Sequence, residues 1–240
     1  MSIADNIKRV QDRIDDACAK ANRDPFEIIL VAVSKQKSVD DIVSAVEAGI
    51  QHIGENRVEE GAGKIAPVQA RLQDPLTWHM VGHVQSRKAK QVIQHFDMVQ
   101  SVDSLRLAKR FSRLAGESDR RLAALLEINV SGEASKQGFA GYNWYQEASV
   151  KERLWNELGE LLQLPHLDIH GLMTMAPFNA EAGTIRRVFA DLVALRDELQ
   201  HSLGVSLPEL SMGMTDDFEL AIAEGSTMIR VGRAIFGDRN

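Results

Sequence analysis

Lys35 is the first residue whose position could support covalent chemistry. It follows the apolar run Ile28–Val33, and strand alternation places it on the same face as Val31 and Val33. An ammonium at the rim of an apolar interior loses hydration, which lowers its pKa and frees a neutral amine for imine formation. The alternative is a lysine that extends its charge to solvent from a strand end.

Arg230 is the second such residue, because it lies between apolar neighbours in the run Met228–Gly232. It shares a strand face with Met228 and Gly232. A buried guanidinium without a partner is costly, so an acid or a ligand must face it. The sequence leaves both partners open.

Small residues near the last two apolar runs could hold an anion. Ser211 and Gly213 end the run Glu209–Gly213, and Gly232 is followed by Arg233. Exposed backbone N–H groups after the last two strands form the usual phosphate site of a (β/α)8 barrel, and glycine allows close approach. Ordinary turn glycines are the alternative.

Two histidines, His79 and His83, have a spacing that suggests a metal pair. Four residues along a strand span roughly 13 Å, which is too far for one ion. No other Cys/His ligand set occurs in the sequence, so we predict no metal site. We expect His83 at the mouth of a pocket and His79 in a structural role.

The elements that must position these residues repeat as a short apolar run followed by an amphipathic stretch. Val188, Leu192, Leu195 and Leu199 show the helical spacing clearly. The apolar runs are Ile28–Val33, His52–Gly54, Thr77–Gly82, Met98–Val102, Ala123–Val130, Ile169–Met175, Glu209–Gly213 and Met228–Gly232.

Eight strands separated by helices predict parallel pairing with helices covering the sheet. We therefore predict an α/β protein, a single (β/α)8 TIM barrel over residues 1–240, with residues 1–22 as an extra N-terminal helix. An open doubly wound sheet is the alternative. In a barrel, the chemistry lies at the C-terminal ends of the strands.

The composition excludes several classes of protein. The 240 residues carry a net charge of −6, and the densest basic run, around Arg87 and Lys90, is short, so we expect no nucleic-acid partner. No apolar run has the length of a membrane span, and no signal pattern opens the chain. A single cysteine, Cys18, fits a reducing compartment. We expect a cytoplasmic protein without a membrane partner.

Several motifs together resemble one family over nearly the whole chain. The chain is similar to the pyridoxal-phosphate homeostasis proteins, whose fold is like the N-terminal domain of alanine racemase. The matching segments are Val33–Lys35, Gly54–Val58, Trp78–Ser86, Gly171–Met175, Ser211–Phe218 and Gly225–Gly232.

The resemblance implies a role for each matching residue toward pyridoxal 5′-phosphate (PLP). Lys35 is implied as the Schiff-base lysine, and Arg230 as the arginine that faces the pyridine nitrogen. The other implied cofactor-binding residues are Ser211, Gly213, Gly232 and the backbone of Arg233 around the phosphate, Asn56 and His83 around the ring, and Thr227 as a further contributor.

The resemblance implies a carrier and regulator of PLP supply rather than an enzyme, with PLP-dependent apoenzymes as partners. A PLP-dependent, racemase-like enzyme is the main alternative, and a sugar-phosphate barrel enzyme is a weaker one. Alanine racemase takes a tyrosine base from a second domain, which also builds its dimer. Here the tyrosines are Tyr142 and Tyr145, both in a loop-like stretch. We therefore predict no catalytic residues and a monomer.

Overall fold

Eight parallel strands close into a barrel in the computed structural model, which describes residues 2–237. The ring order is β4-β3-β2-β1-β9-β8-β7-β5, and a pairing between β4 and β5 completes it. The barrel strands are β1 Ile29–Val33, β2 His52–Glu55, β3 Thr77–Met80, β4 Met98–Val102, β5 Leu122–Asn129, β7 Leu167–Met173, β8 Glu209–Ser211 and β9 Met228–Val231.

This closure confirms the barrel prediction over the open sheet. The short strand β6, Phe139–Ala140, pairs with β5 outside the ring. Met1 and residues 238–240, which the predicted domain includes, lie outside the described residues.

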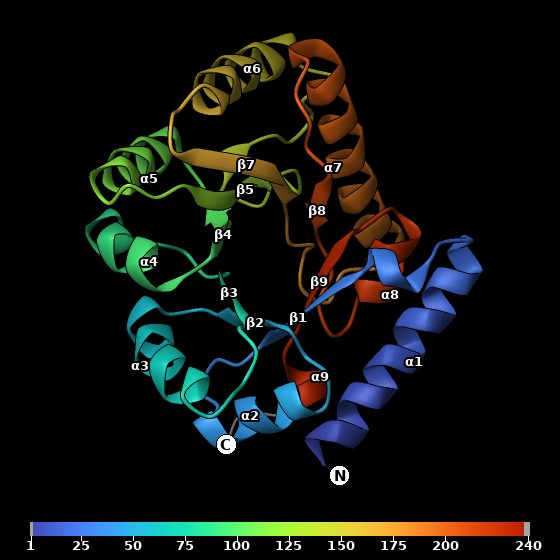
Figure 1. Ribbon diagram of the computed structural model, residues 1–240. Helices are drawn as coiled ribbons and strands as arrows, with labels where there is room; N and C mark the ends of the chain where they lie inside the picture. Colours follow the sequence, from blue (N-terminus) through green and yellow to red (C-terminus); the bar gives the residue numbers. More distant parts are fainter. Residues whose placement is uncertain (1, 238–240) are drawn as a thin grey trace.

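Helices surround the barrel and connect its strands (Figure 1). None of those described is long and apolar enough to cross a lipid bilayer. They are α1 Ile3–Ala21, α2 Val39–Glu47, α3 Val58–Gln69, α4 Ala89–His95, α5 Leu105–Glu117, α6 Ala148–Leu162, α7 Ala182–Leu203, α8 Phe218–Ala223 and α9 Arg233–Phe236, with the short 3₁₀ helices Pro25–Glu27 and Ser86–Lys88.

The predicted extra helix is α1, and it supports the last two loops of the barrel. Ser2 and Asp5 form a capping box that begins the helix. Arg13 pairs with Glu219 and donates to the carbonyl of Thr215 at 3.1 Å, and Asn6 donates to the carbonyl of Ile235 at 2.7 Å. The helix is therefore tied to the segments that follow β8 and β9.

Two apolar cores stabilise the barrel. The larger one fills the space between the strands and the helices, and includes the fully buried rings of Phe96, Phe111, Phe189 and Phe218. The smaller one lies inside the barrel and consists of Val31, Leu125, Met173 and Met228. Side chains that share a strand face with the smaller group therefore point into the barrel.

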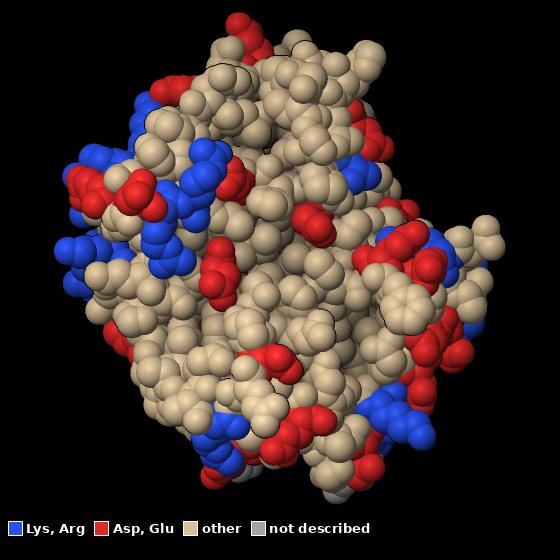
Figure 2. Space-filling model, viewed as in Figure 1, with Lys and Arg blue, Asp and Glu red and all other residues tan. Residues whose placement is uncertain are grey.

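Charged side chains are unevenly distributed over the face in Figure 2. Lysines and arginines gather over α4 and α5, whereas aspartates and glutamates are scattered. The densest basic run of the sequence, around Arg87 and Lys90, extends into α4.

Candidate functional site

Lys35 lies immediately beyond the end of β1. Ser34, which precedes it, is fully buried and continues the ladder by donating its backbone N–H to the carbonyl of Gly54 at 2.9 Å. A turn follows, closed by the N–H of Lys37 on the carbonyl of Ser34 at 3.0 Å. Lys35 is half-buried in this turn, at the C-terminal end of the barrel, as predicted for its position.

A buried ionic cluster supports the turn from outside the barrel. Lys64 donates to Glu55 Oε1 at 2.9 Å, to Glu60 Oε1 at 2.6 Å and to the carbonyl of Ser34 at 2.9 Å. The Ser34 hydroxyl also donates to Glu55 Oε1, at 2.6 Å. Burial raises the pKa of Glu55, while its bonds with Ser34 and Lys64 oppose that shift. These contacts hold the segment that carries Lys35.

Arg230 occupies the barrel interior on the neighbouring strand, β9. Its NH1 donates to the Ser211 hydroxyl at 2.6 Å, and its NH2 donates to the carbonyl of Thr174 at 2.9 Å. Burial lowers the pKa of Arg230 to about 10, and the charges of Glu127 and Asp217 oppose that change. These two hydrogen bonds leave other N–H groups of the guanidinium for a ligand, since a guanidinium has five N–H donors.

The two glycine turns lie next to these residues. β1 pairs with β9, and a Cβ added to Gly232 would lie 3.2 Å from the carbonyl oxygen of Val33. Gly213 has φ +97°, and its carbonyl accepts the backbone N–H of Arg230 at 3.0 Å. The ends of β1, β9 and β8 thus bring together Lys35, Arg230 and both predicted phosphate turns. Arg233 opens α9, and its side chain pairs with Asp216.

Ser211 lies in this group, but its hydroxyl has a different partner from the one expected. It accepts from Arg230 and donates its only proton to Gln100 Oε1 at 2.7 Å. A phosphate dianion accepts hydrogen bonds, so this hydroxyl has no proton to give it. The prediction that the Ser211 hydroxyl holds phosphate is therefore not supported. Thr215, half-buried four residues further along the same loop, offers another hydroxyl that sequence reasoning did not consider.

Asn56 follows β2 and His83 follows β3, the two strands that come after β1 in the chain. Asn56 is half-buried, and its backbone packs so closely on Gly82 that an added Cβ there would lie 2.2 Å from the Asn56 carbonyl oxygen. His83 is exposed and its Nδ1 lies 2.7 Å from an oxygen of Asp103. The two predicted ring contacts therefore lie on adjacent loops at the C-terminal end of the barrel.

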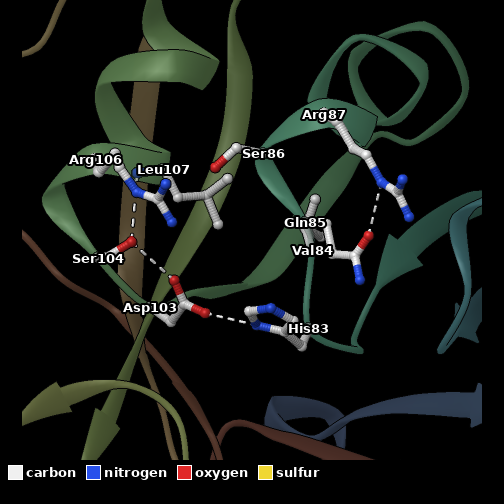
Figure 3. A pocket seen from close by; sticks show the side chains of 9 residues that line it. All are labelled: His83, Val84, Gln85, Ser86, Arg87, Asp103, Ser104, Arg106 and Leu107. Atoms are coloured by element: carbon white, nitrogen blue, oxygen red, sulfur yellow. Dashed lines mark hydrogen bonds and ion pairs between the residues drawn. The ribbon is translucent and has the colours of Figure 1, made fainter.

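A cavity of about 240 Å³ opens beside His83 (Figure 3). His83 points toward Asp103, whose other carboxylate oxygen accepts from the Ser104 hydroxyl at 3.0 Å. Arg87 is turned to Gln85, to which it donates at 2.9 Å. Within residues 2–237, no three His, Cys, Asp or Glu side chains are grouped to bind a metal ion.

Thr227 lies at the wrong end of the barrel for cofactor binding. It precedes β9, and its hydroxyl donates to the Glu209 carboxylate at 2.6 Å and accepts the N–H of Leu210 at 2.8 Å. Glu209 begins β8, so this cluster belongs to the N-terminal ends of the strands. The prediction for Thr227 is wrong, because it placed a residue that precedes a strand with those that follow one.

Glu127 is a candidate that sequence reasoning missed. It lies two residues after Leu125 on β5, which places it on the interior face, and it is 4% exposed. Burial raises the pKa of Glu127 to about 7; the charge of Asp103 adds to this, while Arg230 and His83 oppose it. An inward acid near the C-terminal end of β5 is a readable signal in the sequence.

Comparison with known proteins identifies the family. The family model of the alanine racemase N-terminal domain matches residues 2–240. A pyridoxal phosphate homeostasis protein of Pseudomonas aeruginosa is 41% identical over 240 residues, which cover 100% of this chain and 96% of that protein. One from Escherichia coli is 37% identical, covering 99% and 97%. The chain belongs to the pyridoxal phosphate homeostasis protein family.

Solved structures agree with this family and its fold. PipY of Synechococcus elongatus, solved with PLP bound, has a TM-score of 0.83 and 36% identity, covering 98% of this chain and 100% of PipY. An alanine racemase of Clostridium difficile has a TM-score of 0.72 and 16% identity, covering 98% of this chain and 60% of the racemase. The racemase shares the barrel fold, and the resemblance inferred from the motifs is confirmed.

Proposed function

We propose that this protein binds PLP as a Schiff base on Lys35 and serves the intracellular homeostasis of that cofactor. The observation that carries the proposal is the meeting of a lysine, a buried arginine and two glycine turns at the ends of the adjacent strands β1, β9 and β8. The family name of its relatives and the PLP-bound PipY structure support it.

The residues present fit the groups of this cofactor. PLP supplies an aldehyde that condenses with an amine, together with a phosphate and a ring nitrogen that need donors. Lys35 offers the amine, and the N–H groups of Arg230 left over from its two protein contacts suit the ring nitrogen. Backbone N–H groups around Gly213 and at the start of α9, with the Thr215 hydroxyl, suit the phosphate.

Asn56 and His83 would flank the ring from the ends of β2 and β3. Their loops touch, since the Asn56 backbone packs on Gly82. This arrangement would bind and orient a planar ligand.

We infer that the protein is a PLP carrier without useful turnover, and that apoenzymes receive the cofactor. Racemisation needs acids or bases on both faces of the substrate carbon. The racemase uses a tyrosine as one of these bases, but here Tyr142 and Tyr145 are about half-exposed, at 52% and 51%, so neither is buried in a substrate site. Arginine keeps its proton, so Arg230 leaves the ring nitrogen unprotonated and the ring a weak electron sink. Glu127 is the one described acid we would test as a second base.

Two experiments test this proposal. Borohydride reduction of the PLP-loaded protein, followed by peptide mapping, should place the pyridoxyl group on Lys35, and Lys37→Arg should not change the result. Label found mainly on another lysine would overturn the assignment. Solvent-deuterium exchange at the α-carbon of L- and D-amino acids should be negligible; exchange at an ordinary enzyme rate, about 1–1000 per second, would favour the racemase.

A further inference from the structure

A chain of side-chain hydrogen bonds crosses the barrel interior beneath the proposed cofactor site. From Arg230 it passes to Ser211 at 2.6 Å and from Ser211 to Gln100 at 2.7 Å. Gln100 Nε2 lies 3.0 Å from His79 Nδ1, and His79 Nε2 lies 3.0 Å from His52 Nδ1. The chain joins five strands, β9, β8, β4, β3 and β2.

The donor in every link follows from the guanidinium, which can only donate, and from the orientation of the Gln100 amide, whose oxygen faces Ser211. The Ser211 hydroxyl accepts from Arg230, so it must donate to the Gln100 carbonyl oxygen. The amide nitrogen of Gln100 then donates to His79 Nδ1, which leaves the His79 proton on Nε2. Nε2 in turn donates to His52. In this orientation of the Gln100 amide, a single arrangement of protons satisfies the chain.

The burial of the chain makes this arrangement rigid. Ser211 and Gln100 are fully buried, and His79 is 1% exposed. Burial lowers the pKa of His79 to about 3, so the neutral ring required by the chain is the form present near neutral pH. Broken bonds at such depth leave buried polar groups unsatisfied, which opposes alternative orientations of Gln100.

We infer that Gln100 is a positioning residue for Arg230, and that His79 fixes the amide of Gln100. Gln100, acting through Ser211, and the Thr174 carbonyl together hold the guanidinium in one orientation. Its remaining N–H groups are thereby aimed at a single neutral acceptor, the ring nitrogen of a pyridine ligand. The inference rests on the proposed function, and it gives Ser211 a role in ring recognition instead of phosphate binding.

The test compares PLP with its 1-deaza analogue, in which carbon replaces the ring nitrogen. Dissociation constants are measured by absorbance for the wild type, Gln100→Met and His79→Phe, with Ser112→Ala as the control. Ser112 also carries a buried hydroxyl, but it bonds the Pro165 carbonyl far from the chain. Gln100→Met should weaken PLP binding on the order of ten-fold, equivalent to about 1.4 kcal/mol, and change binding of the deaza analogue less than about two-fold.

His79→Phe should show the same selectivity with a smaller loss, and Ser112→Ala should change neither ligand. If Gln100→Met does not fold, Ser211→Ala replaces it with the same expectation. Unchanged PLP affinity, or an equal loss for both ligands, would overturn the positioning role. A wild type that forms no adduct on Lys35 would instead overturn the proposed function, so the two failures are distinguishable.

Discussion

Replacing Glu127 by glutamine should flatten the pH dependence of this protein's stability. The carboxyl is 4% exposed inside the barrel, and burial raises its pKa from 4.5 to about 7. The folded state therefore binds this proton more tightly than the unfolded state does. The stability that the protonated carboxyl contributes is fully present below about pH 4.5 and is lost as the pH rises through 7.

The size of the effect follows from the two pKa values. A pKa raised from 4.5 to about 7 corresponds to roughly 3 kcal/mol over the whole titration. Between about pH 5 and about pH 8 the part lost is roughly 2.5 kcal/mol. Glutamine has nearly the same shape and does not titrate, so Glu127→Gln removes this loss.

Urea unfolding of the PLP-free protein, measured at both pH values, provides the assay. The difference in unfolding free energy between Glu127→Gln and the wild type should be roughly 2.5 kcal/mol larger, in favour of the variant, at about pH 8 than at about pH 5. Glu152→Gln, which removes an exposed carboxyl from α6, is the matched control and should show no such gain. If Glu127→Gln differs from the wild type by the same amount at both pH values, the carboxyl is not a buried acid with a raised pKa.

Three further predictions follow from the placement of other residues. Thr227→Val should lower the unfolding free energy by about 1 kcal/mol, through lost hydrogen bonds to Glu209 and Leu210, and leave the PLP dissociation constant unchanged; weaker PLP binding would return Thr227 to the site. Gly213→Ala should destabilise the fold by at least about 2 kcal/mol in thermal unfolding, because its φ is +97° and the added Cβ would lie 2.9 Å from Phe218 Cα; a stability equal to the wild type would contradict this. Sedimentation should show a monomer, and a stable, concentration-independent dimer would refute that expectation.

The order of strands and helices could be predicted from the sequence because it depends on local periodicity. Each apolar run is bounded by an amphipathic helix, and the eight runs match the eight barrel strands to within a few residues. Lys35 and Arg230 also became candidates from the sequence, since a cation beside or within an apolar run is costly unless it has a partner. The same reasoning located Gly213 and Gly232 at strand ends.

Thr227 shows where strand reasoning failed. Its closeness in sequence to Arg230 suggested a shared site, but the two ends of a strand lie at opposite ends of the barrel, and Thr227 precedes β9. The hydroxyl accordingly bonds Glu209 at the N-terminal end.

Partner choice across the barrel was decided only by the tertiary structure. Alternation along β4 and β5 places Gln100 and Glu127 on one face or the other, but it does not say which side chains from distant strands meet them. Closure of the ring brings Gln100 to Ser211, which is 111 positions away in sequence, and so redirects the serine proton from a phosphate to an amide. The same closure buries Glu127 among the charges of Asp103, His83 and Arg230, and its pKa is set by that burial and those charges, none of which a linear sequence contains.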